Sequence, residues 1–136
     1  MINAYLENMV FTANPVRQVI LLYDKAISCL EEAVEIMEKG SQDYEDIKAK
    51  YQALGRATEI LTVLKLTLNK EEGGEVAKNL EDIYEALSKD LIRITIEGDE
   101  PETIKKMVKI LKDLRESWEE VERSVYGKPK TDTYAV

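Results

Sequence analysis

The residue types that most often perform catalysis or bind metals are nearly absent from this chain. Its 136 residues include no histidine and a single cysteine, Cys29. Zinc sites are usually built from cysteine and histidine, and the di-iron sites of helical bundles need Glu-x-x-His pairs on facing helices. A Ser-His-Asp triad is excluded for the same reason. We therefore expect no metal, no cofactor and no catalytic residue.

Carboxylates and amines are the remaining groups that could do chemistry. The chain has 27 acidic and 19 basic residues, for a formal net charge of −8. Such a chain is not expected to bind nucleic acid or an anionic membrane, because both attract Lys and Arg. Most carboxylates fall on polar helix faces, which indicates solvated surface charge, although an enzyme that uses carboxylates alone stays formally open. Gly73-Gly74 lacks the Gly-Lys-Ser/Thr that would complete a phosphate-binding loop.

Three features of the sequence predict a cytoplasmic protein. Cys29 lies among apolar residues, which predicts a buried, unpaired thiol and a reducing compartment. No stretch approaches the roughly 18 continuous apolar residues of a membrane-spanning helix. The N-terminus has no basic region followed by an apolar run, so we expect no signal peptide.

Four helices are predicted to position the side chains. Asn14-Pro15 opens the first, because asparagine caps helices well and proline is tolerated at the first helical position. Asp99 and Glu102 resemble a capping box at the start of the last. Apolar residues recur at helical spacing over about residues 15–39, 43–68, 75–97 and 99–126.

The connections between these helices are short, which makes neighbouring helices antiparallel. The predicted fold is all-α: an antiparallel up-down-up-down four-helix bundle with a short N-terminal apolar segment or helix. We interpret residues 1–14 as an N-terminal lid segment, residues 15–126 as the bundle and residues 127–136 as a flexible tail.

The second helix has an apolar arc wider than a bundle needs. A stripe a little over 100° wide suffices, yet projection at about 100° per residue gives an arc of roughly 200°. Its expected core positions are Ile47, Tyr51, Leu54, Leu61 and Leu68. The arc is extended by Ala49, Ala53, Ala57, Ile60 and Leu64, and Val63 and Leu66 lie outside even this arc. Either neighbouring bundle helices cover both sides, or the second side is a groove for a partner helix. The small alanines would suit either arrangement.

The N-terminal segment is apolar but too short to join the bundle as a full helix. Its apolar residues include Tyr5, Leu6 and Met9. We hypothesise that these three residues form a lid over an apolar groove and move when a partner binds. A disordered terminus is the alternative.

Four short motifs follow one another in register with the predicted helices. They are Tyr5-Leu6-Glu7 through Thr12-Ala13-Asn14-Pro15, Leu22-Tyr23-Asp24-Lys25-Ala26-Ile27, Gly73-Gly74-Glu75-Val76-Ala77 with Asn79-Leu80, and Leu114-Arg115 with Trp118. Together they resemble the flagellin-specific export chaperones of the FliS family, over about residues 3–122. The family has glycine in place of Lys25 and Leu-Asp in place of Leu68-Asn69.

The resemblance implies a cytoplasmic chaperone that binds one protein client and catalyses nothing. Members of the family bind the C-terminal segment of flagellin, which is disordered when free. Binding prevents premature polymerisation and keeps flagellin competent for flagellar type III export. Other flagellar regulators or export components are further candidate partners.

Client-binding residues follow from the apolar arc and from the family motifs. We expect contacts from Ala53, Ala57, Ile60, Val63, Leu64, Leu66, Asn69 and Tyr84, with Tyr5, Leu6 and Met9 as the lid. Tyr23 and Trp118 are expected in the core. Two other functions stay open: a different small acidic helical secretion chaperone or an anti-factor that sequesters a regulator, and a structural bundle that associates with its own copies.

Overall fold

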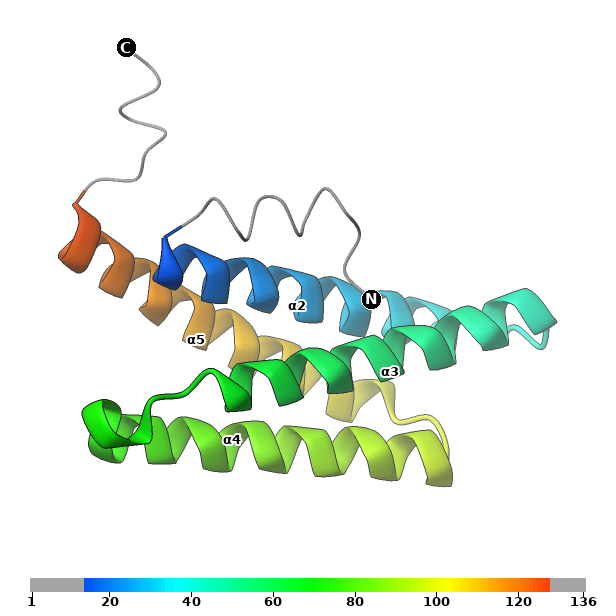
Figure 1. Ribbon diagram of the computed structural model, residues 1–136. Helices are drawn as coiled ribbons and strands as arrows, with labels where there is room; N and C mark the ends of the chain where they lie inside the picture. Colours follow the sequence, from blue (N-terminus) through cyan, green and yellow to red (C-terminus); the bar gives the residue numbers. More distant parts are fainter. Residues whose placement is uncertain (1–13, 128–136) are drawn as a thin grey trace, which may run out of the picture.

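The computed structural model describes residues 14–127. The predicted lid residues Tyr5, Leu6 and Met9, and the predicted tail beyond Gly127, lie outside the described residues. Between them the chain forms four α-helices and no strand. They are α2 (Pro15–Lys39), α3 (Tyr44–Leu66), α4 (Lys70–Glu97) and α5 (Pro101–Tyr126), drawn in Figure 1.

Successive helices run in opposite directions (Figure 1), so the predicted four-helix bundle is confirmed. Ion pairs mark the antiparallel register of α2 and α5: Arg17 with Glu122 near one end and Glu38 with Lys105 near the other. The predicted core cysteine, Cys29, is free and buried. No helix of the described chain is long and apolar enough to cross a membrane.

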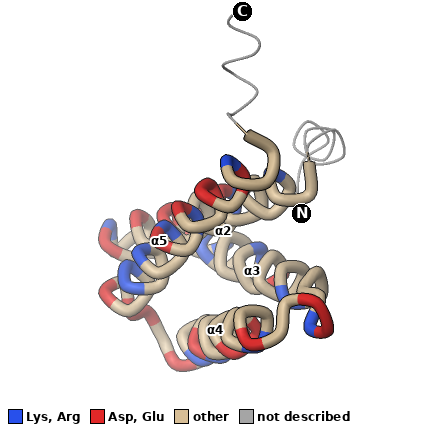
Figure 2. The backbone as a smooth tube through the Cα atoms, turned by 90° about the vertical axis from the view of Figure 1, so that its left-hand side faces the viewer, with Lys and Arg blue, Asp and Glu red and all other residues tan. Residues whose placement is uncertain are grey.

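The bundle is open on one side. Helix α2 packs against both α3 and α5, whereas α4 packs mainly against α3. Figure 2, a view rotated by 90° about the vertical axis from that of Figure 1, shows α4 and α5 separating from each other beyond their connecting loop. One flank of α4 and one flank of α5 are therefore left without a neighbouring helix in the described part of the chain.

Most helix ends follow the predicted signals. Asn14 caps α2, its side chain accepting a hydrogen bond from the backbone N–H of Arg17, and Pro15 is the first helical residue. Gly40 ends α2 in the left-handed conformation, with φ of 65°. Such a conformation is cheap only for glycine.

The starts of α4 and α5 differ from the prediction. Helix α4 begins at Lys70, because the side chain of Asn69 caps an additional turn by accepting from the N–H of Glu72. Gly74 then breaks the regular helix with φ of 53° and ψ of −129°. The expected cap at Asp99 is wrong: Glu100 is the N-cap of α5, and Asp99 pairs with Lys50 of α3 instead.

The core contains residues of all four helices. Its fully buried large side chains are Ile20, Tyr23, Leu30, Leu54, Leu61, Leu64, Tyr84, Leu91, Ile94, Ile104 and Leu111. Tyr51 was expected among them, but the structure exposes 46% of it. The rows of apolar residues read from the sequence therefore mark helices correctly, but only part of each row is buried.

Candidate protein-binding surfaces

Five of the eight predicted client-binding residues lie inside the bundle, four of them on α3. Ala53, Ala57, Ile60 and Leu64 are at most 4% exposed and belong to the main core cluster. The small side chains of α3 admit neighbouring helices of the bundle itself, one of the two arrangements that the sequence left open. Contact of these four residues with a client stays a prediction, and it would require the bundle helices to separate.

Three of the predicted contacts are accessible. Val63 is 39% exposed and Leu66, the last residue of α3, is 76% exposed. Asn69 is also at the surface, where its side chain caps α4. These three residues lie near the α3–α4 connection, so the structure brings them to one end of the molecule.

Tyr84 is buried and forms a polar link in the core. Its hydroxyl lies 2.5 Å from that of Tyr23, and the rings meet edge to face with centroids 6.3 Å apart. Trp118 of α5 acts on the pKa of both tyrosines in the lowering direction, because its indole N–H is a donor, but burial outweighs it. Burial, the largest cause, raises the pKa of both tyrosines, so both stay neutral at physiological pH. The link joins α2, α4 and α5, and Tyr23 and Trp118 have the structural role expected of them.

An apolar stripe on the open side of α5 was not predicted as a binding surface. Val121 is 39% and Val125 63% exposed, although both belong to the apolar residues that recur at helical spacing along this helix. Ile110 is 41% exposed, and Leu114 and Trp118 are half-buried against the core. Spacings of three or four residues put them on one flank of the helix. This flank lies opposite Lys105 and Lys112, which pair with α2, and we call it the α5 stripe.

Two residues of α4 extend the apolar surface across the open side. Ile83 is half-buried against the core and Val76 is 68% exposed. The sequence signal that could have revealed the α5 stripe is the width of the apolar arc on α5. The same projection that we applied to the second helix shows that Ile110 and Val121 fall beside, and not within, the buried row.

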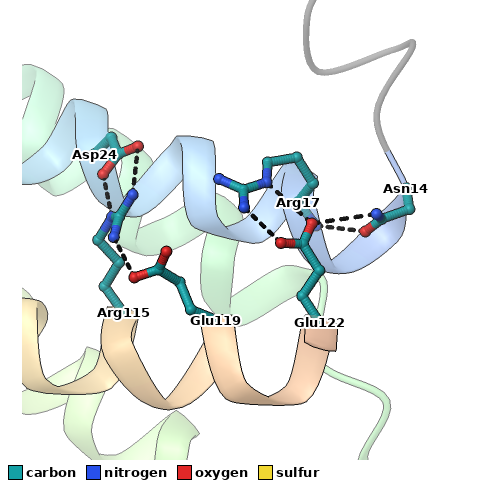
Figure 3. Close-up of polar contacts among 6 residues, drawn as sticks. All are labelled: Asn14, Arg17, Asp24, Arg115, Glu119 and Glu122. Atoms are coloured by element: carbon teal, nitrogen blue, oxygen red, sulfur yellow. Dashed lines mark hydrogen bonds and ion pairs between the residues drawn. The ribbon is translucent and has the colours of Figure 1, made fainter. Parts of the chain in front are cut away.

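The seam between α2 and α5 is polar and closed by ion pairs (Figure 3). The Glu122 carboxylate accepts from Arg17 through Nε at 3.0 Å and Nη2 at 2.5 Å, and from Asn14 Nδ2 at 3.2 Å. Hydrogen bonds from Arg17, above all, hold the pKa of Glu122 below its ordinary value, against the opposing effect of burial. Arg115 bridges Asp24 of α2 and Glu119 of its own helix.

A shallow hollow of about 570 Å³ lies on the same seam. Lys112, Arg115, Glu116 and Arg123 are among its lining residues, so charges of both signs surround it. Ligand pockets are lined mostly by apolar and aromatic side chains with a few directed polar groups, whereas Ile27 is the one apolar residue among those that line this hollow. Among the described residues, no group of carboxylates and cysteine is arranged to hold a metal ion. The surfaces suited to binding are therefore the apolar ones.

Comparisons with known proteins agree on one family. The family profile described as "Flagellar protein FliS" matches residues 1–125. The flagellar secretion chaperone FliS of Salmonella typhimurium (strain LT2) is 31% identical over 117 residues, covering 85% of this chain and 82% of the relative. The protein of the same name from Campylobacter jejuni (strain 81116) is 31% identical over 120 residues, 88% of each chain. That from Vibrio cholerae (strain N16961) is 25% identical over 116 residues, 85% of this chain and 81% of the relative.

Proposed function

The chain belongs to the FliS family of flagellar secretion chaperones, and from that premise we propose that it binds the C-terminal segment of flagellin in the cytoplasm. Its family is one of chaperones and not of enzymes. Binding would keep flagellin from polymerising before export and competent for the flagellar type III apparatus. The absence of histidine fits a protein that acts by packing rather than by chemistry.

The observation that carries the proposal is the α5 stripe with its two neighbours on α4. From Ile110 to Val125 the stripe spans about 23 Å, enough to accommodate roughly four turns of a client helix. Amphipathic helices bind such grooves through apolar residues at the spacing of one helix face. The half-buried Leu114 and Trp118 would form the floor and the more exposed Ile110 and Val121 the walls.

The energetics favour a large, mostly apolar contact. A disordered client loses several kcal/mol to ordering when it folds on binding, whereas each fully buried Val or Ile contributes about 1.5–3 kcal/mol. The α5 stripe alone offers only a few such residues. We therefore propose that the client also contacts Val63 and Leu66 near the α3–α4 connection. Both residues are accessible, and both are among the contacts expected from the sequence.

The test is calorimetric titration with the C-terminal ~40–50 residues of a flagellin, a length that allows several helical turns. We expect one-to-one binding, a negative heat-capacity change and a gain of helicity on mixing. Ile110→Glu should raise Kd at least about 30-fold, because a buried apolar contact is replaced by a charge. Its melting temperature should hold, because the side chain is accessible.

The matched control is Ile96→Glu. Ile96 is 78% exposed on α4, and its flank of that helix is the one next to α3 rather than the one next to α5. This variant should bind the flagellin segment like the wild type. Equal weakening by both substitutions would show that the open side is not the binding site, and absence of binding at high micromolar concentration would reject flagellin as the client.

A further inference from the structure

The apolar surface of α5 is wider than the part of it that the bundle buries. Projected at about 100° per residue, the apolar side chains span roughly 160°, from Ile110 at one edge to Val108 at the other. The buried row, centred on Leu111, lies on the Val108 side of this arc, together with the charged Glu122 and Arg115. Because a stripe of about 100° is enough for a bundle helix, apolar spacing alone does not decide which part of the arc faces the core.

Burial of apolar side chains by itself favours a different rotation of α5. If the helix turned about its own axis by about 50°, the excess of the arc over the width that a bundle needs, the α5 stripe would move towards the core and chiefly Val108 would move out. The observed rotation instead leaves Val121 39% and Val125 63% exposed, and it buries the charged Glu122 to 5%. Buried apolar area is the main favourable term in folding, whereas a buried carboxylate is costly unless it is paired. Contacts other than apolar burial therefore hold α5 in the observed rotation.

Two polar clamps between α2 and α5 provide such contacts (Figure 3). In the first, the Glu122 carboxylate accepts hydrogen bonds from Nε and Nη2 of Arg17, at 3.0 and 2.5 Å, and from Asn14 Nδ2 at 3.2 Å. In the second, Arg115 donates to the Asp24 carboxylate through Nε and Nη2. Contacts of two guanidinium nitrogens with one carboxylate are strong and have a defined geometry.

The clamps are specific to the observed rotation of α5. Side chains reach about 5–6 Å from a helix axis, so a turn of about 50° displaces their ends by about 5 Å. Hydrogen bonds of 2.5–3.2 Å do not survive such a displacement. Glu122 and Arg115 are seven residues apart on one flank, so the two clamps act at two heights and fix the rotation of the helix. The other two ion pairs of the seam, made by Lys105 and Lys112, have side chains 46–56% exposed, so water screens them.

We propose that Arg17 and Asp24 are positioning residues for client binding: through Glu122 and Arg115 they hold α5 in the rotation that exposes the α5 stripe. Both residues belong to α2 and lie away from the stripe, so they act on the client only through α5. In the turned helix the stripe would be covered and the site closed. The consequence for the client rests on the proposed function, whereas the rotation of α5 is a property of the free protein.

Thiol labelling without client tests the rotation. In a Cys29→Ala background, one reporter thiol is placed at Val121 on the stripe or at Val108 in the buried row. The test variant combines Glu122→Gln with Arg115→Gln, which weakens both clamps and leaves the net charge unchanged. In this variant N-ethylmaleimide should react at least about threefold more slowly with Val121→Cys and at least about threefold faster with Val108→Cys, because a turn covers one flank and opens the other.

Opposite changes at the two thiols distinguish rotation from loosening. A loss of stability alone would speed labelling at both positions, and that result, or unchanged rates at both, would overturn the proposal. The matched control, Lys109→Gln with Glu116→Gln, removes the same two charges from exposed positions that form no ion pair with α2 in the described part of the chain. It should label like the parent. Arg115→Gln alone keeps the Glu122 clamp and should show the same pattern with smaller amplitude, which provides the test if the double variant does not fold.

The affinity for the flagellin segment tests the consequence for the client. If only molecules with an exposed stripe bind, the apparent Kd rises in inverse proportion to their fraction. The variant with both clamps weakened should therefore raise Kd at least about fivefold in calorimetric titration, and the matched control should leave it unchanged. An unchanged Kd in a variant that shows the labelling pattern would overturn the role in client binding. A wild-type chain that does not bind flagellin would instead reject the proposed function and leave the labelling result standing.

Discussion

At the scale of single residues, Glu122 shows how a carboxylate can hold two helix ends together. Its three hydrogen bonds join the start of α2, through Asn14 and Arg17, to the last turns of α5. Asn14 is used twice, since its Oδ1 caps α2 while its Nδ2 binds Glu122. The residue at which the described chain begins is therefore fixed to α5.

This contact predicts a pH dependence. The folded pKa of Glu122 is lowered, so its stabilisation is present above the unfolded pKa, about 4.3, and is lost as pH falls through the folded value. Glu122→Gln should cost about 1–2 kcal/mol at pH 7, and the difference from wild type should shrink towards zero in strong acid. Urea unfolding at several pH values measures this, with Glu116→Gln as an exposed control on the same helix. A difference that stays constant with pH would contradict the assignment.

A substitution of Tyr84 distinguishes a structural role of this residue from a client-binding role. Tyr84→Phe keeps the ring but removes the hydroxyl that pairs with the buried Tyr23 hydroxyl. We expect a loss of about 1–2 kcal/mol in stability and unchanged affinity for the flagellin segment, measured by thermal unfolding and calorimetry. Weaker binding with unchanged stability would instead support the contact expected from the family motif.

At the scale of elements, the three glycines inside α3 and α4, Gly55, Gly73 and Gly74, differ in why the position holds glycine. Gly74 adopts a backbone conformation that side chains rarely tolerate, and a Cβ on Gly73 would lie 2.6 Å from that of Ala77. Together they let α4 change direction after its first turn. Gly55 meets neither restriction.

Alanine substitutions should therefore have opposite effects. Gly74→Ala and Gly73→Ala are each expected to destabilise the protein by about 1–3 kcal/mol. Gly55→Ala should stabilise the protein by up to about 1 kcal/mol, because alanine favours the helix. Denaturant midpoints measure all three. Destabilisation by Gly55→Ala would reveal a role for this glycine inside the bundle.

At the scale of the whole molecule, the helices differ in how many neighbours support them. Helix α2 packs on both sides, but α4 packs mainly against α3. Local opening is easiest where few apolar contacts hold an element. The open side that exposes the α5 stripe is thus also the side on which the bundle can most readily adapt.

Hydrogen exchange should show this difference. In the free protein, amides of α4 are expected to exchange faster than those of α2, and the flagellin segment should slow exchange in α4 and along Ile110–Val125 of α5. Ile110→Glu should lose that protection at matched client concentration. Protection confined to α2 would place the client on another face.

The sequence predicted the four helices well because helix formation depends on local patterns. Apolar spacing, the Asn14-Pro15 start and the glycine after α2 all act within a few residues, and the structure has them as expected. Asp99 was misplaced because its partner, Lys50, lies far away in sequence on α3. The family motifs likewise depend only on residue order, and the comparisons bear them out.

Only the tertiary structure decided which apolar residues are covered. By itself the sequence determined four amphipathic helices, an absence of histidine and a family resemblance. It could not show that Ile60 and Leu64 are buried while Leu66 and Val121 are exposed, because burial depends on which neighbouring helix lies over each flank. The separation of α4 from α5 made the α5 stripe accessible, and the uncovered side of α3 did the same for Tyr44 and Tyr51. Helix-forming signals are local, whereas the exposure that makes a surface available for binding is set by packing between distant segments.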